Sequence, residues 1–194
     1  MKAFPPFLAV LAFLALIVSA GAAPLGVTDV DGRSVVLNAP GAVTAVISSS
    51  QDTADATRDA GAVLDRYRGR ADFQLVIVVD LRDSLAGIVE GYVRSRMKQN
   101  LDAEAVRLRP FYLANGNHHD PRPELEAIPD FSGQVVDALH WDKDASRLRV
   151  TVFGRDGRLL RRWDNLKDYR ELDAVVSKEL EPPPPSPSAP PSAT

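Results

Sequence analysis

Two short, mostly apolar runs, at 43–47 and 73–79, constrain the fold of this chain more than any other feature. Apolar runs of this length, without alternation, are typical of strands that are buried on both faces of a sheet. Between the two runs, apolar residues recur at the spacing of one helix face, at Ala60, Val63, Leu64 and Tyr67. A strand, a helix and a second strand in this order predict a parallel pair joined by a right-handed crossover.

Two hairpins are expected to flank this unit. Residues 27–30 and 34–37 are β-type runs around Asp31-Gly32, a dipeptide that favours a two-residue turn. Near the other end, residues 148–153 and 159–163 flank the turn sequence GRDG at 154–157. The second hairpin is expected to extend the central sheet with antiparallel strands.

Helical periodicity predicts two further helices. One begins at Ser84, with Asp83 as its cap, and ends at about Leu101; its apolar stripe consists of Leu85, Ile88, Val89, Tyr92, Val93 and Met97. We expect Ile88 and Tyr92 to face the sheet. The other helix is defined by Tyr169, Leu172, Val176 and Leu180. These elements predict an α/β fold, a three-layer α/β/α sandwich around a mixed central sheet.

The order of elements resembles the thioredoxin-like superfamily from about residue 27 to residue 180. The best local match is VTVFGRDGRLLRRW at 150–163, which resembles the last two strands of redoxin domains. More narrowly, residues 79–100 and 138–163 resemble small periplasmic proteins of the YtfJ type. The resemblance implies a thioredoxin-like domain over residues 23–180.

The chain contains no cysteine. The resemblance implies a Cys-x-x-Cys pair that precedes a basic residue and the first helix. Thr57-Arg58 stands where the second cysteine and its basic neighbour would be, which places Ala54 at the first cysteine position. Disulfide exchange requires a thiolate. We therefore expect a scaffold from which the redox chemistry is absent.

The two ends of the chain predict export. Lys2 precedes an apolar run at 7–18, and Ala20-Gly21-Ala22 is typical of a signal peptidase site. We expect residues 1–22 to be a signal peptide, the protein to be periplasmic or secreted, and no stable membrane span after cleavage; an uncleaved anchor is the alternative. Residues 181–194 are rich in proline, which predicts a disordered tail. A docking segment or a cell-wall tether is the alternative for that tail.

Polar residues follow the first buried strand. Ser49, Ser50, Asp52 and Thr57 are candidates for ligand binding, because ligands of open α/β sheets bind at the carboxyl ends of strands. Turn formation and helix capping are the simpler interpretation of the same residues. The sequence contains neither a glycine-rich phosphate loop nor a Gly-x-Ser-x-Gly motif around these serines.

The histidines provide one candidate metal site, at His118, His119 and Asp120. The spaced ligand pairs of metal sites are missing, and the surrounding Asn, Gly and Pro residues are typical of an exposed loop. We therefore expect no metal and no cofactor. A formal net charge of −3 also argues against nucleic acid as a partner.

Two classes of function remain open. The first is a non-redox binding or accessory module of the cell envelope, whose partner is an envelope protein or a small ligand. The second is a periplasmic enzyme of unknown reaction, with a polar site at the carboxyl ends of the strands. No recognisable set of nucleophile, acid and base stands in the sequence, which favours the first class.

Overall fold

The computed structural model describes residues 23–82 and 90–181. The predicted signal peptide and all but the first residue of the predicted tail lie outside these residues. So do the predicted cap Asp83 and the first turn of the helix that was expected from Ser84. No helix among the described residues is long and apolar enough to cross a bilayer.

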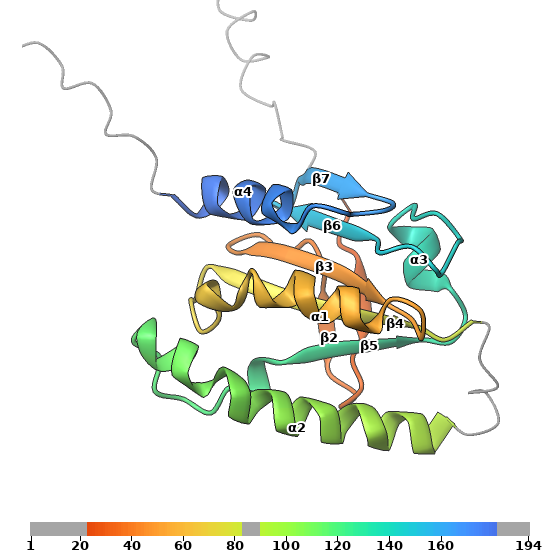
Figure 1. The fold of residues 1–194 in the computed structure, drawn as a ribbon, viewed down its shortest axis with the longest axis horizontal. Helices are drawn as coiled ribbons and strands as arrows, with labels where there is room; N and C mark the ends of the chain where they lie inside the picture. Colours follow the sequence, from red (N-terminus) through yellow and green to blue (C-terminus); the bar gives the residue numbers. More distant parts are fainter. Residues whose placement is uncertain (1–22, 83–89, 182–194) are drawn as a thin grey trace, which may run out of the picture.

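Within the described residues, five strands form a mixed sheet in the order β5-β4-β3-β6-β7 (Figure 1). Their bounds are Val43–Ser49 (β3), Phe73–Asp80 (β4), Glu126–Asp130 (β5), Val150–Phe153 (β6) and Leu159–Trp163 (β7). Strands β3, β4 and β5 are parallel, whereas β6 and β7 are antiparallel to their neighbours. The predicted α/β sandwich with a mixed sheet is confirmed.

Helices cover the two faces of this sheet. Helix α1 (Ala54–Ala62), a 3₁₀ turn at Asp65–Tyr67 and helix α4 (Tyr169–Leu180) pack on one face. Helix α3 (Gln134–Ala138) and the hairpin of β1 (Gly26–Thr28) and β2 (Ser34–Val36) cover the other. The alternating side chains of β3 supply both cores, because Ala45 and Ile47 contact the first group and Val46 contacts the second.

Helix α2 (Glu90–Ala114) lies along the β5 edge of the sheet (Figure 1). Met97 packs against Val79 and Ala127, which belong to the α1 face of β4 and β5. A short 3₁₀ turn (Arg122–Glu124) then leads into β5. Helices α1 and α2 therefore stand on the same side of the sheet, next to each other.

The predicted end of the second helix is wrong. The helix continues to Ala114 and contains Pro110. Its apolar stripe also continues, because Leu101, Ala105, Leu108 and Tyr112 follow Met97 at intervals of four, four, three and four residues. Prolines inside a helix remove one backbone hydrogen bond and disfavour the preceding turn, but this stripe holds the helix against Leu125 and the 3₁₀ turn.

The prediction that Tyr92 faces the sheet is also wrong. Its side chain is 67 % exposed. A helix that lies at the edge of a sheet contacts it through a narrow stripe, and Val93, one position further round the helix, takes that place. Ile88 lies outside the described residues.

Two smaller expectations also need correction. The first hairpin does not have a two-residue turn, because Thr28 pairs with Ser34 and the five residues between them form the loop. The Asp29 carboxylate, which is buried, accepts hydrogen bonds from the backbone N–H groups of Asp31 and Arg33 and thereby shapes that loop. Strand β5 was not predicted, since Pro129 argues against a strand; prolines are tolerated at such a sheet edge.

Candidate ligand-binding site

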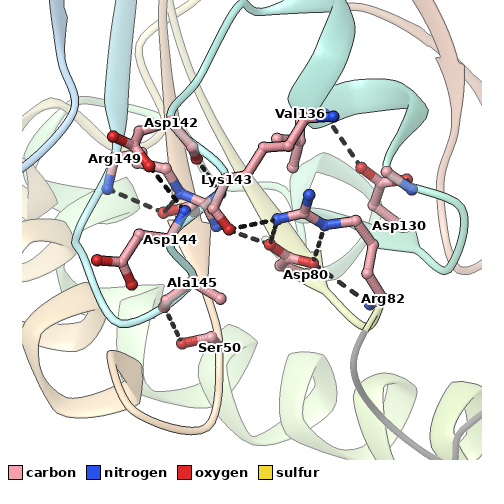
Figure 2. A network of polar contacts seen from close by, with 12 residues as sticks. Ser50, Asp80, Arg82, Asp130, Val136, Asp142, Lys143, Asp144, Ala145 and Arg149 are labelled. Atoms are coloured by element: carbon pink, nitrogen blue, oxygen red, sulfur yellow. Dashed lines mark hydrogen bonds and ion pairs between the residues drawn. The ribbon is translucent and has the colours of Figure 1, made fainter.

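The carboxyl ends of the parallel strands β3, β4 and β5 lie at the same end of the sheet. A buried ion pair is found there. Asp80, the last residue of β4, accepts a hydrogen bond from Arg149 Nη2 at 2.9 Å, and the two side chains are 2 % and 0 % exposed. Arg82 forms a second ion pair with Asp80, at 2.7 Å (Figure 2). Burial acts to raise the pKa of Asp80, but the hydrogen bonds from Arg82 and Arg149 outweigh it and lower this pKa to about 2.

Arg149 is fully enclosed, and its neighbours satisfy most of its donors. Its backbone N–H donates to Ser48 Oγ at 2.9 Å, and Nη1 donates to the carbonyl of Asp142 at 2.8 Å. The guanidinium lies 5.5 Å from the centre of the Trp141 ring. This network connects β3, β4 and the segment before β6, so it fixes the backbone at the strand ends (Figure 2).

The four polar residues predicted from the sequence lie beside this network but separate into two groups. Ser50 Oγ donates to the carbonyl of Ala145 at 2.7 Å and, with Thr53, forms a local turn before α1. Thr57 Oγ1 is bonded to the carbonyl of Ser48 at 2.8 Å. Asp52 is exposed. Only Ser49 and Thr57, together with Ala54, border a cavity, which is described next.

A cleft of about 280 Å³ lies between α1 and α2, over strands β4 and β5. We call it the α1–α2 cleft. It has a largely apolar floor and outer wall, formed by Leu75, Ile77, Val79, Met97, Leu101 and Ala127. Its volume is near the lower end of the ~300–1,000 Å³ that is usual for ligand pockets. On the α1 side Gly61 contributes no side chain, and a Cβ built there would only touch Leu75, at 4.0 Å. The missing side chain helps to keep the cleft open.

One end of the cleft, near the start of β4, is charged. Arg107 of α2 donates to Asp65 at 3.0 Å and to Glu104 at 2.6 Å. The hydrogen bond from Arg107 lowers the pKa of Glu104, and partial burial opposes this shift. The hydrogen bonds that Arg107 donates to Glu104 and Asp65 raise the pKa of Arg107. Arg107 therefore donates hydrogen bonds to both carboxylates at the same time.

Arg68 lines the same end of the cleft, and few of its hydrogen-bond donors have acceptors. Its residue is only 7 % exposed, yet Nη1 has one long hydrogen bond, 3.4 Å to the carbonyl of Leu75. Its Nε has no acceptor among the residues that the structure describes. Burial lowers the pKa of this guanidinium, while Tyr112 and Asp65 act in the opposite direction. Buried polar groups are nearly always hydrogen-bonded, so this arginine requires an explanation.

The weak metal candidates lie elsewhere. His118, His119 and Asp120 are all exposed and stand in the loop after α2. Asp120 forms a long ion pair, 3.8 Å, with Arg109. No group of three or more metal-ligating side chains comes together in residues 23–82 and 90–181.

Comparison with solved structures identifies the fold. A protein described as a thiol:disulfide interchange protein DsbE from Chlorobium tepidum superposes with a TM-score of 0.51 and 14 % identity, over 83 % of this chain and 96 % of that one. A thioredoxin-like protein from Aeropyrum pernix gives a TM-score of 0.50 and 13 % identity, over 80 % and 89 %. This protein has a thioredoxin-like fold. Neither a protein-family model nor a curated protein sequence matches the chain.

In this thioredoxin-like fold, the residues that the sequence assigned to the degenerate redox motif lie at the start of α1. Ala54 is the first residue of the helix and is exposed, whereas Thr57 is buried. Both line the α1–α2 cleft, at the end opposite Arg68. The cleft thus begins where the resemblance to redox proteins places their thiols.

The sequence did not predict the charged end of the cleft. Glu104 and Arg107 lie beyond the predicted end of the second helix. Asp65 and Arg68 follow the first helix, where nothing in the sequence distinguishes them from the other charged residues. The continued apolar stripe of α2 was the available signal, because it predicts that Glu104 and Arg107 flank a buried helix face.

Proposed function

We propose that this protein is an exported, non-redox binding module of the cell envelope, and that its α1–α2 cleft holds a small, largely apolar ligand or a short apolar segment of an envelope protein. The cleft is the observation that carries this proposal, since a concave apolar surface with a few polar groups is the usual form of a binding site. The absence of cysteine excludes disulfide exchange as its activity.

The envelope location is part of the proposal and rests on the sequence. The signal-peptide pattern of residues 1–22 supports it, as does the likeness of residues 79–100 and 138–163 to YtfJ-type periplasmic proteins. The intact mass of protein purified from an envelope fraction is expected to match a chain that begins at Ala23. A mass that matches a chain with residues 1–22 still attached would contradict the predicted export.

The alternative, an enzyme with a polar site at the strand ends, gains no support from the described geometry. Asp80 is held as a carboxylate by two arginines, and the hydroxyls of Ser50 and Thr57 are bonded to backbone carbonyls. A general base needs a free position within reach of a substrate, and a nucleophile needs such a base beside it. The strand ends therefore support a structural role for these groups.

The methionine content of the chain provides a direct test. The sequence holds only two methionines, and one of them, Met97, lines the cleft while the other is Met1. In protein labelled with ¹³C at the methionine methyl groups, a titration with toluene is expected to shift the Met97 signal in a saturable way. Gly61→Leu should abolish this shift by filling the cleft.

Gly61→Ala is the matched control for that variant. Its Cβ meets only ordinary contact with Leu75, and alanine favours the helix, so toluene binding should remain and stability should not fall. Two results would contradict the proposal. The Met97 signal could fail to respond to toluene in the parent protein, or it could respond equally in Gly61→Leu.

A further inference from the structure

Two arginines of this protein are buried to a similar degree but differ in their partners. Arg149 is 0 % exposed and has an ion pair, a carbonyl acceptor and a hydroxyl acceptor. Arg68 is 7 % exposed and, among the described residues, has one carbonyl acceptor at 3.4 Å. A guanidinium carries five N–H donors, and a buried one without acceptors is destabilising. Arg68, which lines the α1–α2 cleft, therefore has hydrogen-bond donors that no described residue satisfies.

The charges around Arg68 indicate which acceptor would suit it. Asp65 and Glu104 both bond to Arg107, so these three groups together carry one negative charge. Arg68, which interacts electrostatically with Asp65 and Glu104, brings the sum of the four groups to zero. The other two charged residues that line the cleft, Arg58 and Glu126, have opposite signs and leave this sum unchanged. An added carboxylate or phosphate would leave this half-buried cluster with excess negative charge. An uncharged oxygen satisfies the donors of Arg68 and leaves the sum unchanged.

We infer that Arg68 selects, for the α1–α2 cleft, small apolar molecules that carry an uncharged carbonyl oxygen, such as an amide or an ester of a short acyl chain. The carbonyl accepts from Arg68, and the chain lies on the apolar side chains of β4 and α2. This inference rests on the proposed function, because it names the ligand class of the same cleft.

A second hollow borders Arg68 and must be distinguished from the first. It holds about 400 Å³ and is lined by polar residues around Gly69 and Asn117 together with Phe73, Leu75 and Tyr112, but not by Met97. Its lining is more polar than that of the α1–α2 cleft, so it is less suited to an acyl chain. Because Met97 lines only the α1–α2 cleft, its methyl signal reports which of the two is occupied.

The test compares three probes of equal chain length in the Met97 titration at pH 7. Octanamide presents an uncharged carbonyl, octanoate presents an anion, and octylammonium presents a cation without an acceptor. Octanamide is expected to bind at least tenfold more tightly than octylammonium, since a hydrogen bond to a charged group is lost in the latter. Octanamide should also bind more tightly than octanoate. Equal affinities, a preference for octanoate, or octanamide binding without a Met97 shift would overturn the inference.

Variants of Arg68 separate this inference from the proposed function. In Arg68→Met an apolar side chain of similar volume removes the donors, so the affinity for octanamide relative to that for toluene should fall about tenfold. If toluene still binds but octanamide is unaffected, the inference fails and the proposed function stands. If neither probe binds the parent protein, both fail.

Folding of this variant can be verified independently. A buried charge with few partners is costly, so an apolar residue of similar volume in its place is expected to unfold at the same urea concentration or a higher one. Arg68→Lys, which keeps a charge and a donor, should retain part of the preference for octanamide.

Discussion

Asp80 is a residue whose ionisation contributes to stability. Its pKa is about 2 in the folded protein, against an ordinary value of 3.8. Because the folded pKa is the lower one, the carboxylate stabilises the fold above about pH 4, and this contribution is lost as the pH falls from about 4 to about 2. A shift of this size corresponds to about 2 kcal/mol.

Urea unfolding between pH 2 and pH 5 measures this contribution. Asp80→Asn should be less stable than the parent at pH 7, because Arg149 then lacks its buried counter-charge, and it should lose less stability on acidification. Other carboxylates with lowered pKa values, such as Asp31 and Asp72, contribute to both proteins equally. An identical pH dependence in the two proteins would show that Asp80 does not carry it.

At the scale of single residues, the sequence shows which residue types are present but not which neighbours surround them in the fold. Arg68 and Arg149 cannot be told from the many exposed arginines of the chain, because their burial is produced by packing between segments that are far apart. The capping interpretation is wrong, because the N-cap residue of α1, Thr53, makes no side-chain capping hydrogen bond. Ser50 and Thr57 lie near the end of the first strand, and their hydroxyls donate to backbone carbonyls. Which of them faces a cavity depends on the position of α2.

Helix α2 forms the outer wall of the cleft. Its buried side chains are expected to contribute more to the free energy of unfolding than its exposed ones. Leu108 is 0 % exposed and belongs to a cluster with Tyr112 and Leu125, whereas Val106 on the same helix is 72 % exposed. Leu108→Ala is expected to lower the free energy of unfolding by about 2–5 kcal/mol. Val106→Ala should change it by less than about 0.5 kcal/mol. Equal effects in urea unfolding would mean that α2 does not pack through this stripe.

The elements differ in how far the sequence predicts them. The buried strands β3 and β4 are mostly apolar runs, and the last hairpin has a turn sequence between two strands, so local pattern was sufficient. Strand β5 and the second half of α2 each contain a proline, which local rules treat as a stop. Tertiary contact overrides the rule in both: the apolar stripe holds α2, and the edge position of β5 tolerates Pro129.

At the scale of the whole molecule, the order of elements was enough to predict the sandwich, because few topologies satisfy a crossover followed by a hairpin and a helix. The cleft could not be predicted in this way. It depends on the distance between two helices on one face of the sheet, which is set by the length of α2 and by small residues such as Gly61. The start of α1 thus lines one part of the cleft, and α2 forms its outer wall.

The final prediction tests whether this scaffold still has the geometry for a disulfide at the start of α1. Residues three apart on a helix share a face, so Ala54→Cys combined with Thr57→Cys should place two thiols within bridging distance. Under glutathione-buffered oxidising conditions the double variant is expected to lose two hydrogens in mass and to remain folded, with a loss of about 1 kcal/mol because the Thr57 hydroxyl bond to Ser48 is removed. Ala54→Cys combined with Ala56→Cys is the control, since residues two apart point to different faces and should not close. If the first pair stays reduced, or if it closes only with unfolding, the start of α1 does not correspond to the redox position and the alignment of Ala54 and Thr57 with that motif is wrong.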